Sequence, residues 1–390
     1  MFDYILATAK PLTWSLKFWP VGLASFVIAT VATRLCEKIA LRLGIVDKPD
    51  KLVKTHQKAT PYLGGVGMFI GLAAGILCAL HCLTQECPPL VHKWLVGIII
   101  AGAVVCVVGC IDDILNIRPW QKVVGQVAAA SVLVATGVTP MLNPFDGPTG
   151  LIIGTFVVIV FVLGATNSLN LLDGIDGLCA GVTAIMAFGM LLLATLMGVV
   201  QGPGSPGPGD SARVVVCLAI LGSACGFLLF NYPRRTGARI FMGDAGSLLL
   251  GLSMATLMIL SAEKAPQFWL ASLVIFGLPI LDTAVAFARR TVNKKPLFVS
   301  DRGHIYDQMM DRGLSIRKTV VLCYGLTAIY AVVGLVVSLL SILPALIVCT
   351  ITVLISAITV WRRGYIRKSQ ITNGSTSPSA VSSGPNCSPS

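Results

Sequence analysis

The stretch WLVGIIIAGAVVCVVGCI, residues 94–111, is followed directly by the pair Asp112-Asp113. Its 18 uncharged residues are enough to form a helix that crosses the hydrocarbon core of a bilayer. Because charged groups are costly in that core, the two carboxylates are expected where the helix leaves the membrane. The stretch therefore predicts a membrane-spanning helix that ends in two acidic side chains.

Similar apolar stretches recur along the whole chain. Of its 390 residues, 55% are hydrophobic and only 12% are charged, which is too few charges for the surface of a soluble domain. We predict an all-α, polytopic membrane protein with about eleven transmembrane helices and active-site loops on the cytoplasmic side. The predicted spans are 13–36, 62–84, 94–111, 122–139, 150–166, 178–200, 213–231, 246–262, 267–288, 319–341 and 343–361.

The distribution of basic residues predicts the orientation of these spans. If the N-terminus lies outside, 24 of the 29 Lys and Arg residues fall on one side, and cytoplasmic loops are the ones that retain them. We therefore expect a multi-pass protein of the cell inner (plasma) membrane whose acidic motifs face the cytoplasm. Residues 1–368 would form one membrane domain. Residues 369–390, rich in Ser, Pro, Asn and Gly, are predicted to be a disordered cytoplasmic tail.

A second polar motif lies in the block from Asn167 to Gly177, which contains no Lys or Arg. Near a helix end, residues three apart share one face, so Asn170, Asp173 and Asp176 would point the same way. Acids without a local basic partner favour an external cation or a ligand rich in donors, such as a nucleoside. A simple turn is the alternative interpretation.

A third motif places Asp244 between glycines where a span begins, within Phe-Met-Gly-Asp-Ala-Gly-Ser. This setting suits a carboxylate on Mg²⁺ with backbone N–H groups facing phosphate oxygens, although an N-capping role would also explain it. In a later connector, Arg302 and His304 could bind phosphate. Asp282, inside a span, fits a structural ion pair as well as a site residue.

Carboxylates and basic groups at one membrane face favour phosphoryl chemistry, which depends on positioning and on charge neutralisation by a divalent ion. We expect Mg²⁺, for which Mn²⁺ could substitute. A cation-coupled membrane transporter is the alternative, but its acids should lie at mid-bilayer in broken helices. Here only Asp282 lies within a span, so an enzyme is the preferred hypothesis.

The order of these motifs resembles the polyprenyl-phosphate N-acetylhexosamine-1-phosphate transferase family over residues 20–362. That family includes the phospho-muramoyl-pentapeptide transferases of wall synthesis. A cytoplasmic His-x-His-His typical of related members is replaced by His304-Ile-Tyr-Asp307, which argues against the muramoyl-pentapeptide branch and leaves the sugar open. The CDP-alcohol phosphotransferases are disfavoured, because their motif needs Arg where Gly181 stands.

The resemblance implies an activity, a ligand set and partners. It implies transfer of a sugar-1-phosphate, most simply GlcNAc-1-phosphate, from a UDP-sugar to undecaprenyl phosphate, releasing UMP and starting a lipid-linked cell-envelope glycan. It further implies a homodimer, and no nucleic-acid partner is expected. The resemblance and the chemistry of the motifs together predict these site residues: Asp112, Asp113, Asp244 and His304 as catalytic; Asp244 and Asn170 as metal ligands; and Lys58, Asn167, Asn170, Asp173, Asp176, Asn231, Phe241 and Arg302 as substrate-binding. Whether Asp112 or Asp113 abstracts a proton or only positions phosphate and metal stays open.

Overall fold

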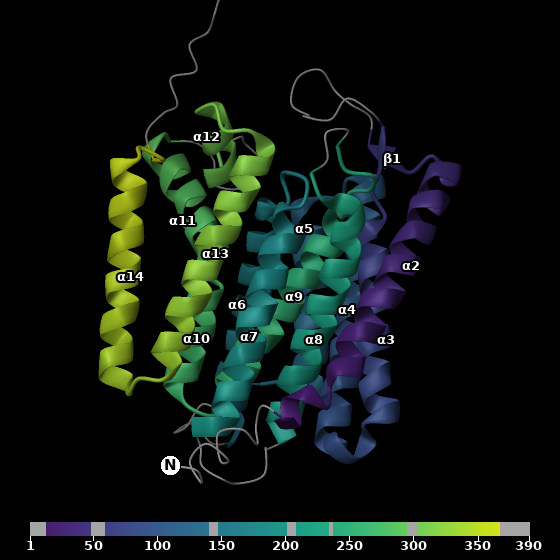
Figure 1. Cartoon of the computed structure of the whole chain (residues 1–390), viewed down its shortest axis with the longest axis vertical. Coiled ribbons are helices and arrows are strands. Elements are labelled where there is room, and N and C mark those ends of the chain that lie inside the picture. The colour runs from purple at the N-terminus through teal and green to yellow at the C-terminus, as the bar shows by residue number, and fades with distance from the viewer. Residues whose placement is uncertain are drawn as a thin grey trace, which may run out of the picture.

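The computed structural model describes residues 13–47, 59–139, 147–200, 208–233, 237–294 and 303–366, and nearly all of them are helical (Figure 1). The only strands in these ranges are β1 (Val46–Asp47) and β2 (Thr60–Pro61), which pair antiparallel. The helices are α2 (Trp19–Leu43), α3 (Gly64–Cys82), η1 (Thr84–Glu86), α4 (Pro89–Leu115), α5 (Pro119–Ala135), α6 (Gly147–Leu172), α7 (Leu178–Val200), α8 (Pro208–Asn231), α9 (Gly243–Ser261), α10 (Pro266–Ile275), α11 (Gly277–Val292), α12 (Ile305–Asp311), α13 (Ile316–Ser338) and α14 (Ile342–Arg362).

The prediction of an all-α, polytopic membrane protein is confirmed. Within the described ranges, nine helices are long and apolar enough to cross a membrane. The pair α10 and α11 is bent by 66° and would count as a tenth span if it crosses as one unit. Helix α5, in the place of predicted span 122–139, has only 17 residues. The count of eleven therefore remains a prediction.

Helix α9 is the buried centre of the bundle, and small residues let its neighbours approach it closely. A Cβ atom added to Gly109 of α4 would lie 2.3 Å from the backbone nitrogen of Ala245 in α9. A Cβ added to Gly251 of α9 would lie 2.3 Å from the Cα of Thr166 in α6. Membrane helices commonly use such residues for close packing. This packing brings the ends of α4 and α6 next to the first turn of α9.

The same end of the bundle carries β1 and α12 (Figure 1). It also holds the C-terminal ends of α4 and α6 and the N-terminal ends of α5 and α9. Tyr306 of α12 donates a hydrogen bond to the carbonyl of Leu171 at the end of α6, and polar groups at the four helix ends contact one another. The polar motifs at residues 112–113, 170–176 and 244 all belong to these ends. The fold thus gathers motifs that are far apart in the sequence.

Candidate active site

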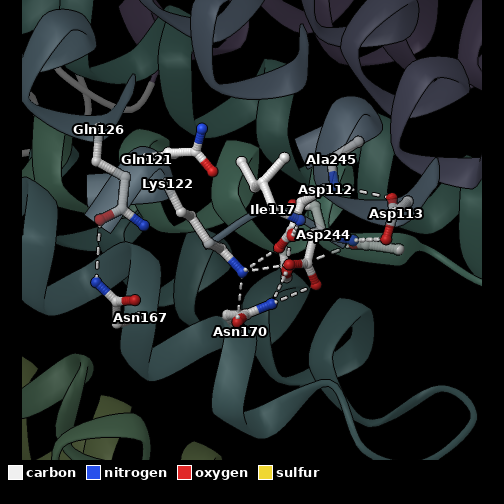
Figure 2. Close-up of polar contacts among 12 residues, drawn as sticks. Asp112, Asp113, Ile117, Gln121, Lys122, Gln126, Asn167, Asn170, Asp244 and Ala245 are labelled. Atoms are coloured by element: carbon white, nitrogen blue, oxygen red, sulfur yellow. Dashed lines mark hydrogen bonds and ion pairs between the residues drawn. The ribbon is translucent and has the colours of Figure 1, made fainter. Parts of the chain in front are cut away.

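The ammonium group of Lys122, on α5, lies at the centre of the gathered polar side chains (Figure 2). Its Nζ is 3.2 Å from Oδ2 of Asp112 on α4 and forms an ion pair with Asp244 on α9. It also donates a hydrogen bond of 3.0 Å to Oδ1 of Asn170 on α6. Four helices therefore each contribute one side chain to a single cluster, which we call the Lys122 cluster: Asp112, Lys122, Asn170 and Asp244.

The adjacent acids Asp112 and Asp113 face different partners. Asp112 accepts a hydrogen bond of 3.0 Å from the backbone N–H of Ile117, which holds its carboxylate toward Lys122. Asp113 instead accepts the backbone N–H groups of Asp244 at 2.9 Å and Ala245 at 3.5 Å. Negative charge at these N–H groups stabilises the start of a helix. Asp113 therefore caps α9 from a neighbouring helix, while Asp112 belongs to the Lys122 cluster.

The orientation of the Asn170 amide is determined by its partners. Its Nδ2 donates to Oδ1 of Asp244 at 2.8 Å and to Oγ of Ser247 at 3.0 Å. Its Oδ1 accepts a hydrogen bond from the ammonium group of Lys122, which can act only as a donor. The amide oxygen of Asn170 and one carboxylate oxygen of Asp244 therefore face the same cation.

One helical turn deeper, Gln126 and Asn167 form a buried polar pair beside the Lys122 cluster (Figure 2). Nδ2 of Asn167 donates to the carbonyl of Leu163 at 2.7 Å and to Oε1 of Gln126 at 3.1 Å. Gln126 is fully buried, and its Nε2 finds no acceptor among the described residues. Asn167, which the sequence predicts to bind substrate, thus donates both of these hydrogen bonds to groups of the protein. Its role toward substrate stays a prediction.

Asp173 stands in the turn between α6 and α7, close to the other acids. Desolvation by the surrounding chain raises its pKa well above the ordinary value, and the negative charges of Asp244, Asp113 and Asp176 raise it further. A carboxyl group in this setting favours its protonated form, which can donate a hydrogen bond. Asp173 can therefore offer a donor as well as an acceptor to a ligand.

Two of the predicted nucleoside-binding residues connect loops in this structure. Asn231 accepts from the backbone N–H of Gly177 at 2.8 Å and donates to the carbonyl of Ile240 at 3.0 Å. Oδ2 of Asp176 accepts from the N–H of Ala238 at 2.8 Å. These bonds join the turn after α6 to the segment before α9. Asn231 is buried, so its amide positions the loops, and contact with a nucleoside stays a prediction.

Phe241 lies in the segment that leads into α9 and is half-buried. Its backbone N–H donates to the carbonyl of Pro61 at 2.8 Å, and its carbonyl accepts from Gly64 at 3.1 Å. The close approach at Gly64 needs a residue without a side chain, because a Cβ there would lie 2.4 Å from the Phe227 ring. The backbone of Phe241 is thus held on both sides by the segment 61–64, and the ring of Phe241 as a platform for uracil stays a prediction.

His304 pairs with Asp282, the acid whose role the sequence left open. Nδ1 of His304 is 2.7 Å from Oδ2 of Asp282, and Oδ1 of the same carboxylate accepts the N–H of Ile305 at 2.7 Å. Asp282 is therefore the partner of a predicted site residue. Two further predicted residues, Lys58 and Arg302, lie outside the described residues, as does the predicted tail 369–390.

The oxygens of the Lys122 cluster fit the requirements of a hard divalent cation. Two carboxylates and one amide oxygen face one position, and Mg²⁺ prefers such oxygen ligands. No group of three or more His, Cys, Asp or Glu side chains suited to a metal occurs in the described ranges. The predicted ligands Asp244 and Asn170 are adjacent, and in this arrangement the ammonium group of Lys122 contacts an oxygen of each.

Comparison with known proteins identifies the family. The model of a family described as "Glycosyl transferase family 4" matches residues 95–262. The decaprenyl-phosphate N-acetylglucosaminephosphotransferase of Mycobacterium leprae is 31% identical over 328 residues, covering 78% of this chain and 79% of the relative. The chain belongs to glycosyl transferase family 4.

Other relatives of this family 4 member carry related names. The probable undecaprenyl-phosphate N-acetylglucosaminyl 1-phosphate transferase of Bacillus subtilis is 28% identical over 338 residues, covering 85% of this chain and 88% of the relative. The undecaprenyl-phosphate alpha-N-acetylglucosaminyl 1-phosphate transferase of Salmonella typhimurium is 27% identical over 324 residues, with 79% and 81% covered. These names confirm the resemblance to polyprenyl-phosphate N-acetylhexosamine-1-phosphate transferases.

The match to family 4 covers the whole Lys122 cluster and ends before the His304–Asp282 pair. Lys122 and Gln126 are the polar residues of this region that the sequence motifs missed. One signal in the sequence could have found Lys122. It begins the predicted span 122–139, which returns into the membrane from the face at which Asp112 leaves span 94–111. Gln126 follows one turn later on the same helix.

Proposed function

We propose that the chain transfers an N-acetylhexosamine-1-phosphate, with GlcNAc-1-phosphate as the first candidate, from a UDP-sugar to a polyprenyl phosphate. The names of the relatives support this assignment. The observation that carries it is the Lys122 cluster, in which three oxygen-bearing side chains from three helices converge on one cation position at the end of a membrane bundle. The distribution of basic residues supports an active site on the cytoplasmic side, and the inner membrane is the proposed location.

In the proposed reaction, an oxygen of the lipid phosphate attacks the β-phosphorus of the UDP-sugar. A new P–O bond forms, the bond between the β-phosphorus and the bridging oxygen breaks, and UMP leaves with that oxygen. A phosphate monoester has a second pKa near 6, so the attacking group is already largely dianionic at neutral pH. No strong general base is then required. Asp112 and Asp113, which already accept hydrogen bonds within the protein, are assigned to positioning.

Asp244 and Asn170 would hold Mg²⁺, and the bound ion would neutralise charge on the pyrophosphate. Lys122 carries the second positive charge of the site and can pair with a phosphate oxygen. The N–H groups at the start of α9 are occupied by Asp113, so this helix end stabilises the position of Asp244. His304 and Arg302 are assigned to the donor phosphates, and Asp173 and Asp176 to the nucleoside side.

Purified full-length protein in detergent, incubated with undecaprenyl phosphate, Mg²⁺ and radiolabelled UDP-GlcNAc, tests the proposal. We expect a labelled, chloroform-soluble pyrophosphoryl lipid and an equal amount of UMP. UDP-GalNAc and UDP-MurNAc-pentapeptide in parallel reactions test the choice of sugar. Asp244→Asn is the matched control, and it should abolish transfer while the protein still elutes as a folded species. The absence of labelled lipid with every UDP-sugar would overturn the proposal.

A further inference from the structure

The carboxylate of Asp282 is completely buried and has two described partners. One oxygen is 2.7 Å from Nδ1 of His304, and the other accepts the backbone N–H of Ile305 at 2.7 Å. We propose that Asp282 is a positioning residue that keeps the His304 ring protonated at Nδ1 and presents its Nε2 to the sugar-diphosphate donor. The second half of this inference rests on the proposed function, while the first half concerns the ring alone.

The hydrogen-bond chemistry of the pair determines which nitrogen carries the proton. An ionised carboxylate can only accept, so Nδ1 of His304 must donate whether the ring is neutral or charged. Among the described residues, Nε2 makes no hydrogen bond. Neutral His304 therefore offers Nε2 as an acceptor, and protonated His304 offers it as a donor to a phosphate oxygen.

Other contacts keep the ring from turning. The ring of Tyr306 stacks on that of His304, with centroids 5.5 Å apart and planes inclined by 7°. Asp307 accepts the backbone N–H groups of Gly303 at 3.1 Å and His304 at 3.3 Å. The backbone on both sides of His304 is thus held by Asp282 and Asp307, and the ring is covered on one face. Such support is what a precisely oriented site residue requires.

The His304–Asp282 pair is also connected to α6, the helix that contributes Asn170 to the Lys122 cluster. The hydroxyl of Tyr306 donates to the carbonyl of Leu171 at 3.2 Å, at the end of α6. A Cβ at Gly174 would lie 1.9 Å from that hydroxyl, so Tyr306 packs directly on the turn that carries Asp173. The His304 loop therefore adjoins the proposed donor site.

The variant Asp282→Asn distinguishes a purely structural role of Asp282 from a role in positioning the His304 ring. The Asn oxygen can still accept from Ile305, which preserves that bond. Its NH₂ group then faces Nδ1 of His304, which must become an acceptor, so the proton moves to Nε2. The fold is expected to survive, whereas Nε2 of the neutral His304 ring changes from a hydrogen-bond acceptor to a donor. In a serine protease triad, the equivalent Asp→Asn change acts in this way and lowers kcat about 10⁴-fold.

The test is ¹⁵N NMR of full-length protein labelled at its four histidines, in detergent. His304→Gln identifies the His304 signals by their loss. We expect the wild-type neutral ring to be protonated at Nδ1 and the Asp282→Asn ring at Nε2. We also expect Asp282→Asn to lower kcat by about 10²–10⁴-fold, with a smaller change in KM for the UDP-sugar. In the His304→Gln background, the same change should have no further effect on kcat.

Asp210→Asn is the matched control, since Asp210 is an equally buried acid at the other end of the bundle, paired with Arg213 and Lys264. It should leave the His304 signals and kcat unchanged. A wild-type His304 ring protonated at Nε2 would overturn the inference, whatever the Asp282→Asn variant shows. An Asp282→Asn variant with the expected tautomer but wild-type kcat would also overturn it. Because the spectra need no substrate, a failure of the proposed function appears separately, as absent transfer with the Nδ1 tautomer intact.

Discussion

The ammonium group of Lys122 forms an ion pair with Asp244, which joins the start of α5 to the first turn of α9. The same nitrogen is 3.2 Å from Asp112, so one cation lies between two carboxylates. Without it the two like charges would repel each other. The ion pair therefore explains how two acids from distant parts of the sequence share one small site.

Replacing Lys122 by Met should lower turnover by at least about 10²-fold, the effect typical of removing one group that stabilises developing charge. It should also destabilise the protein by about 1–3 kcal/mol, because Asp112 and Asp244 lose a common partner. Turnover and the apparent Tm in detergent measure the two effects. Added Mg²⁺ should raise the Tm of Lys122→Met more than that of wild type.

Lys93→Met provides the control for Lys122→Met, because Lys93 is exposed near the start of α4, at the other end of the bundle. It should change neither turnover nor Tm. A Lys122→Met protein that retains half of the wild-type turnover would contradict the assignment.

Replacing Asp113 by Ala should act mainly on stability, since its carboxylate accepts two N–H groups at the start of α9. Loss of a helix cap costs about 0.5–2 kcal/mol. Asp113→Asn should recover part of this loss, because Asn is also a good capping residue. Thermal denaturation in detergent should give the highest Tm for wild type, a lower Tm for Asp113→Asn and the lowest Tm for Asp113→Ala. Equal Tm values for wild type and Asp113→Ala would show that the cap contributes nothing.

The sequence predicted much of this site and missed its centre. The contacts confirm that Asp112, Asp113, Asn170 and Asp244 gather at one end of the bundle, because helix ends and motif positions coincide. The different partners of Asp112 and Asp113 could not be predicted, since they depend on how α4 rotates against α9. Motifs alone could not predict Lys122 either, because no motif in the sequence distinguishes it from the other basic residues.

Replacing Asn170 by Ala should weaken the response to Mg²⁺. Its amide orients Asp244 at 2.8 Å and Ser247 at 3.0 Å and supplies one oxygen to the cluster. Mutation of a residue that holds a metal ligand in place typically lowers metal affinity by about 10–100-fold. After removal of divalent ions by EDTA, a Mg²⁺ titration of transfer should therefore require about 10–100-fold more metal for Asn170→Ala than for wild type. Identical titration curves would remove Asn170 from the proposed metal site.

Replacing Asp173 by Asn should change the pH dependence of stability in a direction that follows from its raised pKa. The folded protein binds the Asp173 proton more tightly than the unfolded chain, whose Asp groups titrate near pH 4. Asp173 thus stabilises the fold fully only below about pH 4, and this contribution is lost as the pH rises through the raised pKa. Asn cannot ionise, so the Tm of Asp173→Asn minus that of wild type should increase from acidic to neutral pH. Thermal denaturation in detergent across this range measures the difference, and a difference independent of pH would show that Asp173 is not held in a desolvated, acidic environment.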